Sequence, residues 1–214
     1  WEAIQKLCLE AVAKFPAGTE LYIKPMFYCA DGFLLPDADK TQFVLHVFKV
    51  PMPGEQGFSA CFSSFARSWP NMAPTDAKAS CLYPNGQRAI REAAEKGFDN
   101  AIMLDGAGNI AEFATSNLWL AKNGVVSTPV DNGTFLNGIT RRRVLALLKA
   151  DGIDVQERSL TRADVEEADE VFSSGNYGKV VHVNRVEGRA LEYGPLARRA
   201  HKLYMDYAES TGRR

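Results

Sequence analysis

The chain has 214 residues, of which 46% are hydrophobic and 24% are charged, a composition typical of a globular protein rather than a disordered one. Its 25 basic and 26 acidic residues give a net charge of −1, so no overall positive field attracts nucleic acid or anionic membranes. Apolar runs fall short of the roughly 18 residues that a membrane-spanning helix needs, and the start lacks a secretion-signal pattern. We expect a cytoplasmic protein that binds neither nucleic acid nor membrane.

The four cysteines are scattered along the sequence, without a C-x-x-C pair or a histidine at metal-ligand spacing. They are Cys8, Cys29, Cys61 and Cys81. We therefore expect free thiols, as is usual in a reducing compartment, and no metal site. The sequence begins with Trp1 rather than Met and continues at once with an amphipathic helix pattern, so we expect the numbering to start inside a longer chain.

Residues 1–50 predict the remainder of a small α/β domain. An amphipathic helix pattern runs to Phe15 and is ended by Pro16 and Gly18. Residues 21–29 and 42–50 are rich in aromatic and β-branched side chains and predict two strands. Residues 51–57 hold two prolines and two glycines and predict an interdomain linker.

Residues 58–214 predict a larger, sheet-rich α/β domain. The expected strands cover residues 58–67, 101–104, 110–114, 117–121, 125–128, 153–158, 170–173 and 180–185. The expected helices are one that ends at residues 96–97, two over residues 139–150 and 162–167, and a last one from residue 195. The overall prediction is a two-domain α+β protein.

Lys78 is a candidate nucleophile because it follows a proline-containing loop and lies between Ala77 and Ala79. Small neighbours favour partial desolvation, which lowers the pKa of a lysine and lets it attack a carbonyl. A solvated surface lysine is the alternative for any single position.

Two segments predict anion-binding turns. Gly138, Ile139 and Thr140 stand at the start of the expected helix, where free amides, the helix dipole and a hydroxyl favour an anion. Residues 173–176, Ser-Ser-Gly-Asn, follow a strand and predict a second turn rich in small donors. Ordinary turns without a ligand remain the alternative for each segment.

Glu112 lies among apolar and small residues in the segment 110–117, which predicts a buried carboxylate. A buried carboxylate is costly unless a cation pairs with it, and a protonated pyridine nitrogen is one such cation. A solvent-facing strand glutamate is the alternative.

In order and spacing, these segments resemble the fold-type IV pyridoxal-phosphate enzymes, and among them the branched-chain amino-acid aminotransferases. The resemblance rests on Leu-Tyr-Ile-Lys-Pro at 21–25, Lys78 with Tyr83, Ile-Ala-Glu at 110–112 with Asn117, Leu-Asn-Gly-Ile-Thr-Arg at 136–141, and Asp-Glu-Val-Phe-Ser-Ser-Gly at 169–175. It implies an α+β fold with a small domain, truncated at its front here, and a large cofactor-binding domain. It also implies a homodimeric enzyme that acts in amino-acid metabolism.

The resemblance implies that Lys78 forms an aldimine with pyridoxal 5′-phosphate and moves the proton at the substrate Cα. Tyr83 would hold the phenolic oxygen of the cofactor, and Glu112 would pair with its ring nitrogen. Residues at the two turns would bind the phosphate, namely Gly138, Ile139, Thr140, Ser174, Gly175 and Asn176. Residues that line the substrate pocket would be Tyr22, Lys24, Asn176 and Tyr177.

The chain departs from the family pattern at several positions. Lys24 and Asn176 stand where Arg and Thr are usual, Asn137 stands where Pro is common, and nothing before Leu21 supplies the family's phosphate-binding Arg. The implied function is transfer of an amino group between an apolar, branched-chain-type amino acid and a 2-oxo acid. A D-amino-acid or amine transaminase, an aminodeoxychorismate-type lyase and an inactive truncated relative remain alternatives.

Overall fold

The computed structural model describes residues 1–212, and the chain divides by its internal contacts into two units, Trp1–Met52 and Pro53–Arg214. We call them unit 1 and unit 2 and describe each by itself. The boundary lies within the proline- and glycine-rich stretch at residues 51–57. Among the helices that the model describes, none has the length and apolarity needed to cross a bilayer.

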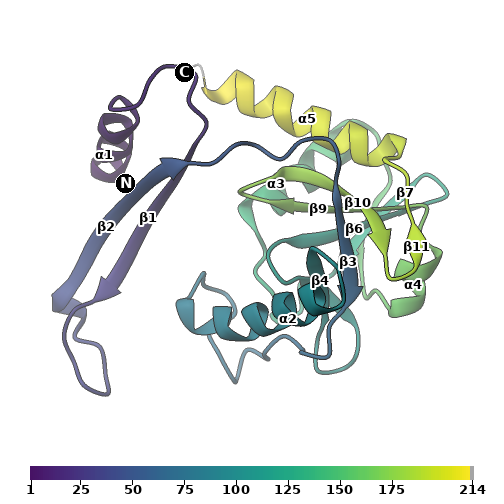
Figure 1. Cartoon of the computed structure of the whole chain (residues 1–214), viewed down its shortest axis with the longest axis horizontal. Helices are drawn as coiled ribbons and strands as arrows, with labels where there is room; N and C mark the ends of the chain where they lie inside the picture. Colours follow the sequence, from purple (N-terminus) through teal and green to yellow (C-terminus); the bar gives the residue numbers. More distant parts are fainter. Residues whose placement is uncertain (213–214) are drawn as a thin grey trace. The chain divides into compact units, whose positions relative to one another are not determined.

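Unit 1 consists of helix α1 (Glu2–Val12) and an antiparallel pair, β1 (Leu21–Cys29) and β2 (Thr41–Lys49), joined through the short 3-10 helix η1 (Ala38–Lys40) (Figure 1). Cross-strand aromatic pairs stabilise the hairpin, with ring centroids 5.1 Å apart for Phe27 and Phe43. The sequence predicted that helix α1 would run to Phe15, but the helix ends at Val12. Pro16 explains the early end, because it has no N–H to donate to the Val12 carbonyl, which accepts from the Phe15 amide instead.

Unit 2 is built on a nine-stranded mixed sheet in which the strand order is β5-β4-β3-β10-β9-β6-β7-β8, with β11 paired to β10. The strands are β3 (Phe58–Phe62), β4 (Asn100–Leu104), β5 (Ile110–Phe113), β6 (Asn117–Lys122), β7 (Val125–Pro129), β8 (Val155–Arg158), β9 (Glu170–Gly175), β10 (Lys179–Val186) and β11 (Arg189–Ala190). Pairs β3/β4, β3/β10 and β7/β8 are parallel, and the remaining pairs are antiparallel.

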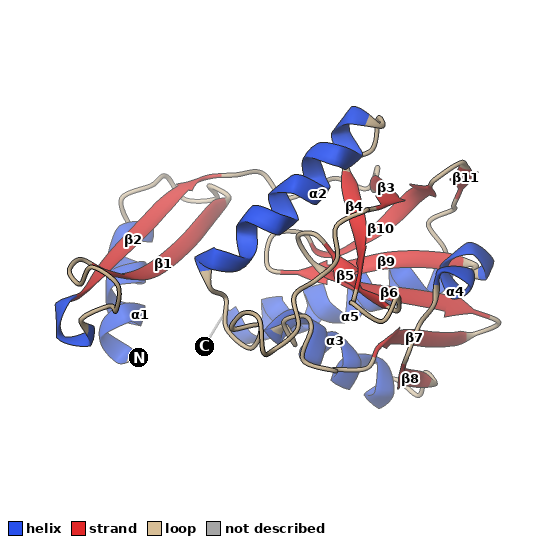
Figure 2. Cartoon of the chain, turned by 90° about the horizontal axis from the view of Figure 1, so that it is seen from below, coloured by secondary structure: helices blue, strands red, loops and turns tan. Residues whose placement is uncertain are grey.

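Helices pack against this sheet (Figure 2). Apolar side chains of the sheet and the helices are buried together in its core. The helices are α2 (Tyr83–Glu95), preceded by the 3-10 turn η2 (Ser80–Leu82), then α3 (Ile139–Ala150), α4 (Arg162–Glu167) and α5 (Pro195–Gly212). Ala89 and Ala93 of α2 pack on β3 and β4, whereas Trp119 and Phe172 stack in parallel beneath α3 and α5 at a centroid distance of 5.9 Å. The sheet and its covering helices therefore form the core of unit 2.

Two strand predictions in unit 2 are wrong in their ends. The predicted strand over residues 58–67 ends at Phe62, because Glu92 on α2 accepts hydrogen bonds from the Ser63 hydroxyl and the Ser64 amide, both at 2.9 Å, and draws the chain out of the sheet. The predicted strand over residues 170–173 extends further, because Ser174 and Gly175, predicted as part of a turn, belong to β9, which pairs with both β6 and β10. Flanking apolar strands override the turn preference of these small residues.

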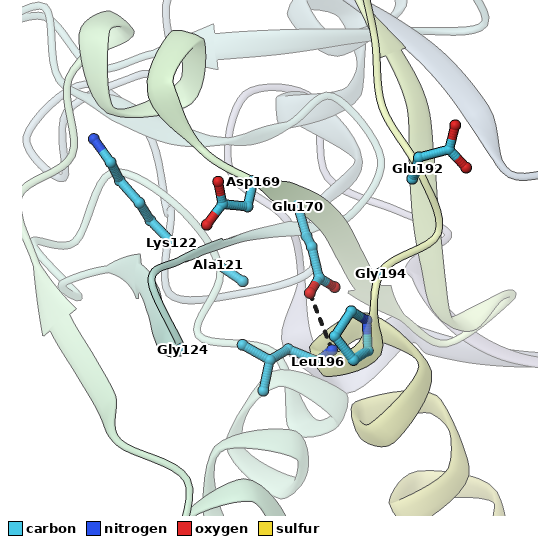
Figure 3. Close-up of a pocket in the computed structure, with 9 residues that line it drawn as sticks. Ala121, Lys122, Gly124, Asp169, Glu170, Glu192, Gly194 and Leu196 are labelled. Atoms are coloured by element: carbon cyan, nitrogen blue, oxygen red, sulfur yellow. Dashed lines mark hydrogen bonds between the residues drawn. The ribbon is translucent and has the colours of Figure 1, made fainter.

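Glu170 at the start of β9 holds the first turn of α5. Its buried carboxylate accepts a hydrogen bond from the amide of Leu196 at 3.1 Å (Figure 3) and another from the amide of Ala197 at 2.7 Å. These contacts satisfy two of the amides that a helix start leaves free. The carboxylate borders a pocket of about 500 Å³ whose lining contains none of the predicted site residues: Ala121, Lys122, Gly124, Asp169, Glu170, Glu192, Gly194, Pro195 and Leu196.

We expect Glu170→Ala to lower the free energy of unfolding by about 1–3 kcal/mol, because it leaves two amides at a helix start without an acceptor. Glu192→Ala, at an exposed glutamate of the same pocket lining, is the matched control. Urea unfolding followed by circular dichroism measures both variants. Equal midpoints for the two would contradict the prediction.

Candidate active site

Lys78 lies in the loop between β3 and η2, and its Nζ is 5.8 Å from the centroid of the Tyr83 ring at the start of α2. The side chain of Lys78 is exposed, so the predicted partial desolvation is wrong for this structure. Ala77 and Ala79 are too small to cover an ammonium, and Ala77 is itself exposed. Thr75 fixes the loop three residues earlier, since its buried hydroxyl donates to the carbonyl of Gly133.

Glu112 on β5 is buried, as its apolar neighbours predicted, with 7% of its surface exposed. Its Oε1 lies 3.0 Å from Nη2 of Arg67, and its Oε2 accepts a hydrogen bond from Nδ2 of Asn117 at 3.2 Å. Burial raises the pKa of Glu112 to about 7, although the positive charges of Arg67 and Lys78 lower it. The charge state of this carboxylate is therefore sensitive to its surroundings near neutral pH.

The segment before α3 offers amides for an anion. Helix α3 begins at Ile139 with Gly138 as its N-cap, and within the described chain no side chain is bonded to its first amides. Ile139 is exposed and Thr140 is buried. The carbonyl of Leu136 accepts from Asn117 Nδ2 at 2.9 Å, which fixes the turn just ahead of the helix. The features that favour anion binding at a helix start are thus present.

Only the end of the second predicted anion-binding turn is a turn in the structure. Ser174 lies inside β9, and its hydroxyl accepts a hydrogen bond from the indole nitrogen of Trp119 at 2.9 Å. Gly175 ends the strand, whereas Asn176 and Tyr177 are exposed in the turn that follows. Asn176 and Tyr177, rather than the buried serine, are therefore the residues whose side chains are exposed at this turn.

Asn117 at the start of β6 joins these parts, a role that the sequence analysis missed. Its amide bonds both Glu112 and the carbonyl of Leu136, and in the sheet it stands opposite Ser174. A Cβ on Gly138 would lie 2.5 Å from Asn117 Oδ1. The only signal in the sequence is that Asn117 follows Glu112 by five residues across a turn of small residues, which places it beside the carboxylate.

Arg141 supports the anion turn from inside the fold. It is fully buried, with Nη1 donating to Asn137 Oδ1 at 2.9 Å and Nη2 donating to the Pro129 carbonyl at 2.7 Å. Nη2 also lies 3.0 Å from a carboxylate oxygen of Glu157, so the charge of Arg141 is paired. Asn137, which stands where the resemblance leads one to expect proline, thus connects the turn to α3.

Tyr22 and Lys24 belong to β1 in unit 1. Tyr22 is half-buried and stacks on Phe48, with ring centroids 5.5 Å apart. Lys24 is exposed and stands opposite His46 on β2. Their expected part in a substrate pocket stays a prediction.

Unit 2 therefore brings Glu112, Arg67, Asn117 and the α3 start into one bonded group, with Lys78 acting electrostatically on Glu112. The family model for amino-transferase class IV matches residues 1–186 of the chain. The chain belongs to the class IV aminotransferases.

Solved structures and curated proteins that are similar to this chain agree with this assignment. An aminotransferase from Brucella abortus, whose crystal structure holds the cofactor PLP, is 44% identical and superposes with a TM-score of 0.95 over 97% of this chain and 75% of its own. A branched-chain-amino-acid aminotransferase from Pseudomonas aeruginosa is 35% identical over 86% of this chain. A probable branched-chain-amino-acid aminotransferase from Aquifex aeolicus is 31% identical over 96% of this chain. The chain spans 63% of the Pseudomonas protein and 68% of the Aquifex protein.

Proposed function

We propose that this class IV aminotransferase uses pyridoxal 5′-phosphate to move an amino group between an apolar, branched-chain-type amino acid and a 2-oxo acid. The observation that carries the proposal is the buried carboxylate of Glu112, held between Arg67 and Asn117. Support also comes from the cofactor in the Brucella relative and from the activity for which the Pseudomonas relative is named.

The residues present fit this cofactor. A buried carboxylate suits a pyridine nitrogen that must stay positive, and the uncapped amides at the α3 start suit a phosphate. Gly138 leaves free the space beside Asn117 that a Cβ would fill. Bound there, pyridoxal phosphate supplies an electron sink that lowers the cost of removing a proton from the substrate Cα.

Each residue then has a defined task. Lys78 would hold the cofactor through Nζ, and once the substrate amine has displaced it, its free amine would accept the proton from the substrate Cα. Tyr83, whose ring faces Nζ of Lys78, donates to the phenolic oxygen. Glu112 keeps the ring nitrogen charged. Phosphate contacts come from Gly138, Ile139, Thr140, Ser174, Gly175 and Asn176. Ser174 and Gly175 contribute through their backbone, because the Ser174 hydroxyl already accepts a hydrogen bond from Trp119.

Two sets of residues are proposed to contact the substrate. Asn176 and Tyr177, exposed after β9, bind the substrate carboxylate, and Tyr22 and Lys24 of β1 contact the substrate side chain. Lys24 carries a charge on a single nitrogen and lacks the two-pronged grip of arginine on a carboxylate. We therefore propose that apolar donors are preferred over glutamate.

A panel of L- and D-amino donors with 2-oxoglutarate tests the reaction. Turnover of L-leucine, L-isoleucine or L-valine to the 2-oxo acid supports the proposal, and the matched D-donors should be inert. Turnover of D-donors or of simple amines alone would favour a D-amino-acid or amine transaminase. Release of pyruvate from 4-amino-4-deoxychorismate would favour the lyase alternative.

We further propose that the enzyme is a cytoplasmic homodimer. Phe33, Leu34 and Leu35 in the β1–β2 loop of unit 1 are almost fully exposed, at 99%, 85% and 82%. A run of large apolar side chains at a loop tip is typical of a surface that another protein covers. Light scattering measures the mass in solution, and a monomer at micromolar concentration would contradict the proposal.

Gly138→Ala should weaken cofactor binding about 10- to 100-fold, because the new Cβ displaces Asn117, which bonds both Glu112 and Leu136. Gly188→Ala is the matched control, since a Cβ there meets nothing within 4 Å. Titration of the cofactor-free protein with pyridoxal phosphate, followed by absorbance, measures both. Equal affinities in the two variants would show that the space beside Gly138 is not needed.

A further inference from the structure

Arg67 is a buried charge that the proposed function does not use. Only 10% of its side chain is exposed, and its Nε is buried with no hydrogen-bond partner in the described part of the chain. Within residues 1–212 its ion-pair partner is Glu112, at 3.0 Å between Nη2 and Oε1. Burying a guanidinium that is not fully bonded lowers stability, so its presence calls for a reason other than stability.

The position of the loop that carries Arg67 does not depend on the guanidinium. The backbone amide of Arg67 donates to the Leu104 carbonyl at 2.8 Å, and the carbonyl of neighbouring Ala66 accepts from Asn85 Nδ2 at 2.5 Å. The Ser63 and Ser64 contacts to Glu92 hold the start of the same loop. The guanidinium is therefore delivered to Glu112 by a loop fixed through other contacts.

The two oxygens of Glu112 are held by different donors. Arg67 holds Oε1 and carries a full charge, whereas the neutral amide of Asn117 bonds Oε2. The charged side chains that act on Glu112 are Arg67, from the loop after β3, and Lys78, from the loop before η2. Lys78 must combine with the cofactor in the proposed reaction, which leaves Arg67 as the permanent positive neighbour of the carboxylate.

We propose that Arg67 is a positioning residue that keeps the Glu112 carboxylate ionised and oriented, so that the ring nitrogen of the cofactor meets a negative charge. This inference rests on the proposed function for its use of the ring nitrogen. Burial already brings the pKa of Glu112 to about 7 with Arg67 in place. Without Arg67 the carboxyl group is neutral at physiological pH, and a neutral carboxyl group does not hold a proton on the ring nitrogen.

The experiment compares Arg67→Gln and Arg67→Lys in the full chain. Carbon-13 NMR of labelled glutamate follows the Glu112 carboxyl group of cofactor-free protein from pH 5 to pH 9, with Glu112→Gln identifying the signal. Arg67→Gln should raise the pH of its titration by about one unit or more, the usual effect of losing an opposite charge within 4 Å. Arg67→Lys keeps the charge and should restore most of the wild-type value.

The loaded enzyme supplies a second readout. Nitrogen-15 NMR of ring-labelled cofactor should report a protonated ring nitrogen in wild type and an unprotonated one in Arg67→Gln. Arg88→Gln is the matched control, because Arg88 stacks on Phe65 at 4.0 Å in the same region, and it should leave both signals unchanged.

An unchanged Glu112 titration in Arg67→Gln would overturn the inference, and so would an equal change in Arg67→Lys, since charge would then not be the cause. If Arg67→Gln does not fold, the pH of the Glu112 titration in Arg67→Lys is compared with that of wild type. An unchanged pH shows that the charge of Arg67 is what matters, and a raised pH overturns the inference. Failure of wild type to take up pyridoxal phosphate would contradict the proposed function instead, and the cofactor-free titration separates these two failures.

Discussion

Lys78→Ala is expected to lower transamination by about 10⁴-fold or more, the scale on which loss of a covalent nucleophile acts in enzymes. The same lysine must bond the cofactor and then move the proton at the substrate Cα, so no neighbour replaces it. Steady-state turnover of L-leucine with 2-oxoglutarate measures the loss. Borohydride treatment of wild type should also attach the cofactor to the peptide that contains Lys78, as mass spectrometry would detect.

Lys96→Ala is the matched control for this experiment. Lys96 follows α2, the helix that begins soon after Lys78, and its Nζ lies 2.8 Å from Glu92 on the protein surface. It should keep near-normal turnover and the borohydride-fixed cofactor. Activity in Lys78→Ala within tenfold of this control would refute the assignment of Lys78.

Glu112→Gln is expected to lower kcat about 10²- to 10³-fold, the usual effect of removing one electrostatic contact to developing charge. Glutamine keeps the size and the hydrogen bond with Asn117 but has no charge to hold a proton on the cofactor ring. KM should change less than kcat, because the lost contact acts on the reacting ring rather than on the substrate. Glu166→Gln, at an exposed glutamate of α4, is the control.

The effect of the same substitution can be measured without activity, from the pH dependence of the free energy of unfolding of the cofactor-free protein. The folded state keeps the Glu112 proton up to about pH 7, whereas an unfolded chain releases it near 4.5. The unfolded state therefore binds fewer protons between these values, so the free energy of unfolding falls as pH rises and then levels off. The fall reaches up to about 3 kcal/mol at about 1.4 kcal/mol per pH unit.

Glu112→Gln should remove this pH dependence without stabilising the protein as a whole, since it leaves Arg67 without its counter-charge. Urea unfolding at pH 5, 6, 7 and 8 measures the slope. A difference in slope between wild type and Glu112→Gln is the expected result, and parallel curves would mean that Glu112 is charged throughout the range.

Much of the fold could be predicted from the sequence because its elements are short and sharply bounded. Helix α3 and helix α4 have the predicted ends, since a glycine and a threonine cap precede them. Strands β4, β6 and β7 end at turns that contain glycine and asparagine. The errors in unit 2, at Phe62 and at Ser174, occur where side chains far along the sequence decide the path, as Glu92 and Trp119 do.

The candidate site could be predicted only where chemistry follows from local context. Glu112 stands out because apolar neighbours surround a charge in the sequence itself. Arg67 does not, since nothing around it in the sequence indicates that β5 will place a carboxylate beside it, 45 positions further on. The connecting role of Asn117 was missed for a related reason, because its contacts to Leu136 and Gly138 arise only when β6 packs beside the start of α3.

The hydrogen bond between the Trp119 indole and Ser174 gives this protein a built-in optical probe. The ring is completely buried and is bonded to the residue that precedes Gly175, at the start of the loop proposed to meet phosphate and substrate. Fluorescence of a buried indole responds to the polarity and hydrogen bonding of its neighbours. Occupancy of that loop can therefore be followed in real time by emission, without any label and without turnover.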